Sequence, residues 1–232
     1  YDAASNTLFS ADAFGKFGAL DCEEDWACEA RRYYIGIVGK YGAQVQALLK
    51  KASALAIEAI CPLHGPVLCE DLAYYLGLYT TWSSYSAESE GVAICYTSVY
   101  GHTKAAAELL AEKLRQNGQK AQLHDLARCD MAEAVEDAFR YDRLVLATTT
   151  YNGDIFPFMK TFIEHLTERN FQNRTLAVIE NGTWAPTAKR VILAMLEKSK
   201  NLEILPQSIT IRSAMTEENR AQIAELAQAL SK

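Results

Sequence analysis

The chain has 232 residues, of which 50% are hydrophobic and 22% are charged, and its formal net charge is -6. This length and composition can bury a sizeable core in one large or two small domains, and the negative charge argues against nucleic acid as a partner. The apolar runs are short and no basic leader precedes them, so neither a membrane span nor a signal peptide is predicted. The sequence opens on Tyr1 instead of Met, so we expect a start upstream of it.

The first part of the chain alternates weakly between strands and helices. Strands are expected at residues 7–10 and 56–61, and helices at 24–38, 43–53 and 70–83. Two strands and three helices make an incomplete sheet. Residues 84–91 are polar and aperiodic, which predicts a linker. We therefore divide the chain into domains at residues 1–88 and 89–232.

The second part has a regular alternation. Strands are expected at residues 92–96, 120–124, 143–149, 174–180 and 208–212, and helices at 103–117, 131–139, 155–168, 187–199 and 216–231. Five strands that alternate with five helices predict a doubly wound α/β fold with a parallel sheet between two helical layers. The central strands are continuous apolar runs, as expected for strands buried on both faces.

Three of these strands end in loops that could hold a ligand. The first loop offers the hydroxyls of Thr97, Ser98 and Thr103 and a permissive Gly101 just before a strong helix, whose free N–H groups attract an anion. Neither a GxGxxG nor a GxxxxGK[ST] motif is present, so a flavin monophosphate fits better than a dinucleotide or a nucleoside triphosphate. The alternative is a helix N-cap without a ligand.

The other two loops supply aromatic residues at the same edge of the sheet. Tyr151 follows the third strand and Trp184 follows the fourth. In an open parallel sheet, ligands bind at the carboxyl ends of the strands where the winding reverses, so these loops should meet at one crevice. Either aromatic residue could instead belong to the core. Together with the phosphate loop, they favour a planar cofactor.

Several motifs, taken in order, resemble those of flavodiiron proteins (A-type flavoproteins). They are TLFSADAFG around Asp12, EARRYY from Glu29, CPLHGP around His64, YTTWS from Tyr79 and YTSVYGHT from Tyr96. The resemblance covers nearly the whole chain. It implies that residues 89–232 form a flavodoxin-like FMN domain with strand order 2-1-3-4-5. It also implies that residues 1–88 form the C-terminal portion of a metallo-β-lactamase-like αββα domain, about half of which lies outside this sequence.

The resemblance assigns FMN-binding roles to three groups of residues. The phosphate loop comprises Thr97, Ser98, Val99, Tyr100, Gly101, His102 and Thr103; the second loop comprises Thr149, Thr150, Tyr151, Asn152, Gly153 and Ile155; and the third loop comprises Asn181, Gly182, Thr183 and Trp184. Ala185-Pro186 follows the third loop where the family often has glycines, which departs from the family pattern around the flavin ring.

Asp12 and His64 are the candidate catalytic and metal-ligating residues. On composition alone they are a turn residue and a structural histidine, but in the family the matching aspartate bridges two irons and the matching histidine ligates one. The upstream HxExDH cluster and a further histidine ligand have no counterpart here. Two ligands cannot hold a di-iron pair, so we expect the site to be whole only with an N-terminal part, in the same gene product or as a separate fragment chain.

The resemblance implies an FMN/di-iron oxidoreductase that reduces O2 to water or NO to N2O. A small donor such as rubredoxin or ferredoxin would supply electrons, and a head-to-tail homodimer would bring one subunit's FMN near the partner's irons. One alternative is a flavodoxin-like electron carrier without its own substrate turnover. Another is a metallo-β-lactamase-type hydrolase, for which a fused flavin domain makes little sense. The six cysteines form no CxxC pair and suit a reducing cytoplasm.

Overall fold

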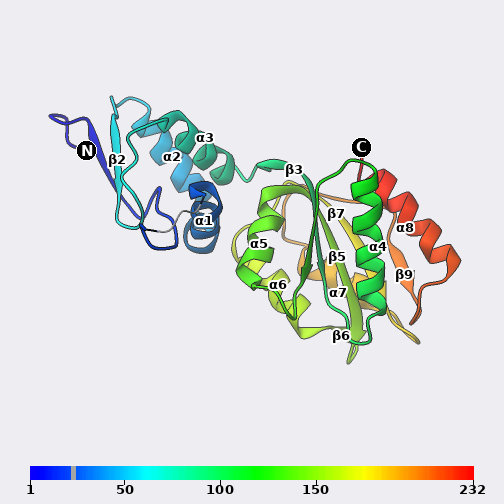
Figure 1. Ribbon diagram of the computed structural model, residues 1–232. Helices are drawn as coiled ribbons and strands as arrows, with labels where there is room; N and C mark the ends of the chain where they lie inside the picture. The colour runs from blue at the N-terminus through cyan, green and yellow to red at the C-terminus, as the bar shows by residue number, and fades with distance from the viewer. Residues whose placement is uncertain (22–24) are drawn as a thin grey trace. The chain divides into compact units, whose positions relative to one another are not determined.

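The computed structural model describes residues 1–21 and 25–232, which form two compact units, Tyr1–Glu88 and Ser89–Lys232. Both units are drawn in Figure 1. Glu24, the first residue of the predicted helix 24–38, lies outside the described residues. Within the described ranges, no helix combines the length and the apolar character that crossing a bilayer requires.

The described residues of the first unit form a small parallel sheet and three α-helices. Strands β1 (Thr7–Ala11) and β2 (Ala59–Pro62) pair in parallel, and the helices are α1 (Trp26–Tyr33), α2 (Gly42–Ala52) and α3 (Leu72–Ser83). Within the predicted helix 24–38, residues 26–38 are helical, but the helix changes from α to π geometry at Tyr34. A 3-10 turn (Gly39–Tyr41) then leads into α2. At Gly42 an added Cβ would lie 2.4 Å from the carbonyl oxygen of Ser83, so only glycine permits this close approach of α2 to the end of α3.

Aromatic rings form the core of the first unit. Phe14 stacks on Tyr79 with ring centroids 4.2 Å apart, and Tyr34 meets Tyr79 edge-on at 5.1 Å. The Tyr79 hydroxyl accepts a hydrogen bond from the Phe14 backbone N–H at 2.5 Å. Phe14 has a positive φ of 65°, so this hydrogen bond holds an otherwise unfavourable backbone conformation at the loop after β1.

The second unit is a doubly wound parallel sheet. Its strands are β3 (Ser89–Tyr96), β4 (Ala121–Asp125), β5 (Tyr141–Tyr151), β7 (Arg174–Asn181), β8 (Leu202–Ile204) and β9 (Ile209–Ile211). The spatial order is β4-β3-β5-β7, followed by β8 and β9, which both pair with β7. Taken with β8 and β9 as one interrupted fifth strand, this is the expected order 2-1-3-4-5. The interruption includes Pro206, which cannot donate to a ladder.

Helices cover both faces of this sheet (Figure 1). On one face α4 (His102–Gln116) and α8 (Glu217–Ala229) pack over an apolar cluster that includes Ile94, Val145 and Ile179. The opposite side carries α5 (Met131–Arg140), α6 (Pro157–Glu168) and α7 (Ala188–Met195). Alternate residues of each strand therefore serve the two helical layers, which explains why the central strands are apolar throughout.

The predicted linker at residues 84–91 is shorter than the sequence indicates, because β3 already begins at Ser89. Glu88 is also fixed to the first unit. Its carboxylate accepts hydrogen bonds from Arg31 Nε at 2.5 Å and Nη2 at 2.6 Å, and from the Trp82 indole at 2.7 Å. Side-chain exposure is 3% for Arg31 and 14% for Glu88, so this is a buried, charge-assisted contact.

We expect Glu88→Ala to lower the free energy of unfolding of the first unit by about 1 to 3 kcal/mol, because it removes the carboxylate that accepts hydrogen bonds from the buried Arg31 guanidinium and the Trp82 indole. Urea denaturation followed by fluorescence of Trp26 and Trp82 measures this change. Glu88→Gln is the matched control, since it keeps an acceptor for the indole and should cost less. A change below about 0.5 kcal/mol in Glu88→Ala would contradict the contact's structural importance.

Candidate functional site

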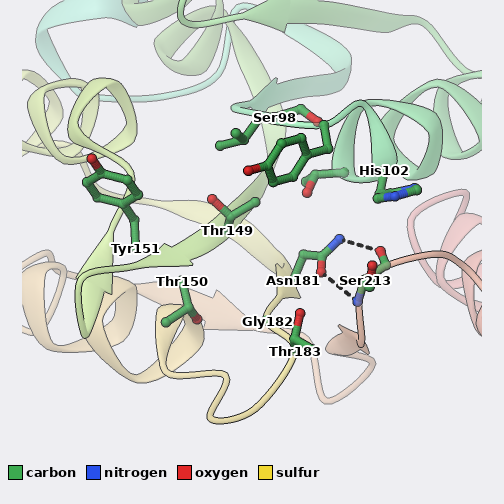
Figure 2. Close-up of a pocket in the computed structure, with 12 residues that line it drawn as sticks. Ser98, His102, Thr149, Thr150, Tyr151, Asn181, Gly182, Thr183 and Ser213 are labelled. Atoms are coloured by element: carbon green, nitrogen blue, oxygen red, sulfur yellow. Dashed lines mark hydrogen bonds between the residues drawn. The ribbon is translucent and has the colours of Figure 1, made fainter.

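A pocket of about 240 Å³ opens at the carboxyl ends of the central strands of the second unit. It lies where the winding reverses, between β3 and its neighbour β5, and loops after β7 and β9 complete it. Figure 2 shows the side chains converging on it from these loops. Its lining comprises Ser98, Val99, Tyr100, His102, Thr103, Thr149, Thr150, Tyr151, Asn181, Gly182, Thr183 and Ser213.

The first wall of the pocket is the turn between β3 and α4. Gly101 has a φ of 87° at the N-cap of α4, and its N–H donates to the Ser98 hydroxyl at 3.1 Å. A glycine is suited to this left-handed position, which lets the chain enter the helix directly from the strand end. The N-cap residue of the 15-residue helix provides no side-chain hydrogen bond, and the first two residues of the helix, His102 and Thr103, line the pocket, so the N–H groups and the positive dipole end of the helix are directed to it.

At this site two threonine hydroxyls are buried without a hydrogen-bond partner among the described residues. They are Oγ1 of Thr103, in the first turn of α4, and Oγ1 of Thr149, near the end of β5. An unsatisfied buried polar atom is costly unless something else supplies its partner. Because both residues line the pocket, the two hydroxyls are suited to a polar ligand that enters between α4 and β5.

The second wall is a tight hairpin. Tyr151 pairs antiparallel with Asp154 of β6 (Asp154–Ile155), and Asn152 and Gly153 form the two-residue turn with φ of 50° and 73°. Asn-Gly is favoured in such turns because both positions need positive φ. A hydrogen bond from Lys160, at 2.7 Å, lowers the pKa of Asp154 and braces the hairpin against α6.

Exposed aromatic side chains lie in the pocket lining at Tyr100 and Tyr151, and a third, Trp184, follows the lining residue Thr183 in the chain. Tyr100 is 88% exposed, Tyr151 is 44% exposed and Trp184 is 91% exposed. Tyr151 is supported by Phe156, with ring centroids 5.3 Å apart at a steep angle. Large exposed aromatic rings beside a concave site are typical of surfaces that receive a flat ligand or a partner.

Eleven of the predicted cofactor-binding residues line this one pocket, drawn from all three predicted loops. Six predicted residues belong to these loops but are not among the lining residues: Thr97, Gly101, Asn152, Gly153, Ile155 and Trp184. Thr97 is buried and bonded to Thr148 at 2.6 Å, and Ile155 is a core residue with 2% exposure. The others form turns or point into solvent. Whether any of these residues contacts a cofactor remains a prediction.

Ser213 is the lining residue that sequence reasoning missed. It follows β9 in the loop before α8, and it lies in the pocket because Asn181 holds it there. The only sequence signal was its place after a fifth strand, at the same edge of the sheet as the three predicted loops.

Asp12 and His64 come together in the first unit, with Asp12 Oδ1 3.6 Å from His64 Nε2. Both side chains are 57% exposed. Two backbone hydrogen bonds join their loops, from Leu63 N–H to the Ala11 carbonyl at 2.8 Å and from Lys16 N–H to the His64 carbonyl at 3.0 Å. The described residues contain no group of three or more His, Cys, Asp or Glu side chains that could hold a metal ion, so this pair by itself does not fit a di-iron centre.

Burial and then the negative charge of Asp12 raise the pKa of Tyr33, whose ring lies 5.8 Å from that of His64. This environment keeps the phenol protonated beside the carboxylate. The Asp12–His64 pair is thus more than half exposed to solvent and has the Tyr33 ring beside His64.

Comparisons with known proteins cover both units. A family model described as a flavodoxin domain matches residues 93–224. A diflavin flavoprotein of Nostoc sp. is 28% identical over 227 residues, which are 94% of this chain and 39% of that protein. An anaerobic nitric oxide reductase flavorubredoxin of Aeromonas hydrophila is 23% identical over 195 residues, which are 79% of this chain and 39% of that protein.

Solved structures show the same fold over the whole chain. Rubredoxin oxygen:oxidoreductase from Desulfovibrio gigas superposes with a TM-score of 0.90 at 20% identity, over 100% of this chain and 60% of that one. The flavodiiron protein from Giardia intestinalis gives 0.92 at 22% identity, over 99% of this chain and 58% of that one. The expected resemblance to flavodiiron proteins is confirmed. The chain spans less than two thirds of the length of these relatives.

We expect Thr103→Val to raise the stability of the ligand-free protein by about 1 kcal/mol, because it replaces a buried unpaired hydroxyl with a methyl group of similar size. Thermal unfolding without ligand measures the effect. Thr103→Ser keeps the hydroxyl and serves as the control. Destabilisation in Thr103→Val alone would show that this hydroxyl already has a partner in the ligand-free protein.

Proposed function

We propose that this chain, which belongs to the flavodoxin domain family, binds flavin mononucleotide in the strand-end pocket and serves as an electron-transfer module of an oxidoreductase. The observation that carries the proposal is the pair of unpartnered, buried hydroxyls of Thr103 and Thr149 in that pocket. They lie where a phosphate and a polyhydroxyl chain would each provide a hydrogen-bond partner.

In this proposal the phosphate group is held at the N-terminus of α4. The first-turn N–H groups donate to it, and the hydroxyls of Ser98 and Thr103 add neutral donors. His102 is exposed at the first position of the helix, where an imidazole can reach an anion from the solvent side. The loop has room for one terminal phosphate and lacks the glycine fingerprint that a pyrophosphate needs.

The ring would lie against the loops after β5 and β7. Tyr151 and Trp184 offer flat, exposed faces, and Thr150 and Gly182 line the wall between them. At Gly182 an added Cβ would lie 3.1 Å from Thr150 Oγ1 and 3.0 Å from Pro186 Cα. The absence of a side chain therefore lets the backbone at Gly182 pack closely against Thr150 and Pro186. When bound, the flavin can accept and release electrons singly or in pairs, and the chain's own task is to bind and orient it.

For the whole protein we propose a flavodiiron-type reductase of O2 or NO. This part rests on the names of the relatives, a rubredoxin oxygen:oxidoreductase and a nitric oxide reductase flavorubredoxin. A small donor such as rubredoxin or ferredoxin would deliver electrons, and a head-to-tail homodimer would bring the flavin of one subunit to the partner's metal domain. Asp12 and His64 would contribute two ligands, and the remaining ligands would come from residues outside this chain.

A second candidate function is an electron carrier without substrate turnover of its own. The observation that favours it is the absence, in the described ranges, of any third His, Cys, Asp or Glu beside Asp12 and His64. Within the described residues, the flavin pocket has lining from all of its proposed loops, whereas the proposed metal site has only two ligands. A polypeptide that acts alone would therefore use the flavin pocket.

We predict that the purified chain binds FMN but not FAD, because the first loop fits a single terminal phosphate. Titration of the flavin-free protein, followed by flavin fluorescence, measures both dissociation constants. Thr103→Val should weaken FMN binding about tenfold, as expected for the loss of one phosphate hydrogen bond. Wild-type protein that ignores FMN would contradict the proposal, and an unchanged affinity in Thr103→Val would place the phosphate elsewhere.

We predict that the 232-residue chain alone retains no pair of irons, because Asp12 and His64 supply too few ligands to compete with water and buffer. Iron analysis after reconstitution and desalting measures the content. His64→Ala provides the baseline and should match the wild-type chain. Two irons per chain in the wild type, lost in His64→Ala, would show that further ligands lie within this sequence.

A further inference from the structure

The amide of Asn181 forms two hydrogen bonds with the backbone of Ser213. Its Nδ2 donates to the Ser213 carbonyl at 2.9 Å, and its Oδ1 accepts from the Ser213 N–H at 3.1 Å. The backbone ladder between β7 and β9 ends just before this point, where Asn181 pairs with Ile211. The side chain of Asn181 therefore continues the ladder by two residues and fastens the loop after β9 to the end of β7.

Ser213 adopts a backbone conformation that needs such support. Its φ is 71°, in the left-handed region that residues other than glycine rarely occupy. Strained non-glycine residues persist where neighbouring contacts hold them, and they concentrate at functional sites. The strain at Ser213 is observed in the one loop of the pocket that carries no family motif.

Ser213 lies at the end of the pocket to which the proposed function assigns the phosphate. Figure 2 shows it on the side of His102, with Tyr151 at the opposite side. Asn181 engages both backbone polar groups of Ser213, which leaves the hydroxyl as the polar group that this residue can turn toward a ligand. Thr103, whose buried hydroxyl has no partner within the described residues, follows His102 in the first turn of α4.

We propose that the Ser213 hydroxyl is a fourth-loop contact for the phosphate group of the flavin mononucleotide, and that Asn181 is the residue that positions it. The proposal rests on the proposed FMN site. It changes the expected role of Asn181, because the amide acts on the cofactor through Ser213 instead of closing the ring side of the pocket. It also implies that the loop between β9 and α8 contributes to the preference for FMN over flavins that lack the phosphate.

The test compares FMN with riboflavin, which has the same ring and ribityl chain without the phosphate. In fluorescence titrations, Ser213→Ala should lower the affinity for FMN by about fivefold to tenfold and leave the affinity for riboflavin within about twofold. Ser213→Gly should show the same FMN-selective loss. Glycine accepts a positive φ without strain, so the loss of FMN affinity in Ser213→Gly would come from the missing hydroxyl and not from a change in the backbone.

The positioning role of Asn181 is tested by a double-mutant cycle. Asn181→Ala should lower FMN affinity at least as much as Ser213→Ala, and the double variant should lose no more than Asn181→Ala alone, because both changes remove the same contact. Ser208→Ala is the matched control. Ser208 precedes β9, lies outside the pocket lining and accepts a hydrogen bond from Lys189 at 2.5 Å, so its removal should leave both flavin affinities unchanged.

Three results would overturn the inference while leaving the FMN site intact. These are unchanged FMN affinity in Ser213→Ala, equal losses for FMN and riboflavin, and fully additive losses in the double variant. If Asn181→Ala does not fold, the two Ser213 variants decide alone. Wild-type protein that binds no FMN would overturn the proposed function itself, and this inference with it.

Discussion

The parallel ladder between β3 and β5 determines where the pocket lies. It runs in register from Val92 opposite Arg143 to Tyr96 opposite Ala147, and the Thr97 N–H then donates to the Ala147 carbonyl at 2.9 Å. A buried hydrogen bond of 2.6 Å between the hydroxyls of Thr97 and Thr148 closes this end of the ladder. β5 continues beyond this point and pairs with β7 as far as Thr149. The chain after β3 leads into α4 and the chain after β5 leads into α6, on opposite faces of the sheet, so a crevice opens between the two loops.

The loops that border this crevice depend on backbone conformations that few residues adopt. Gly101, Gly153 and Asn152 all have positive φ, and their residue types tolerate it. Ser213 does not share this tolerance and is held by Asn181 instead. The site thus combines turns whose conformation follows from local sequence with one turn whose conformation is imposed by a contact from another strand. The conformation of the Ser213 turn therefore depends on a residue that is distant in the sequence.

The same distinction explains what could be predicted from the sequence. The alternation of apolar runs and helices predicted the parallel α/β class, whereas the strand order came from the resemblance to flavodiiron proteins. Local turn and hydroxyl residues marked the three loops, and eleven predicted residues line the pocket. Ser213 could not be predicted, because its placement depends on Asn181, 32 positions away. Glu88 lies in a polar, aperiodic segment that predicts a linker, but it pairs with Arg31, 57 positions away. Local patterns contain no record of such distant pairs.

Asp12 and His64 illustrate a different physical situation. Their 3.6 Å separation is too long for a strong hydrogen bond, and both side chains are more than half exposed, so their mutual attraction contributes little to stability. The backbone hydrogen bonds between their loops hold them near each other regardless of that attraction. The backbone therefore brings a carboxylate and an imidazole together. Phe14, two residues after Asp12 in the same loop, has a φ of 65°, a conformation that residues other than glycine rarely adopt. Such an arrangement is typical of side chains whose role is toward a third group, and that is the role the ligand proposal gives them.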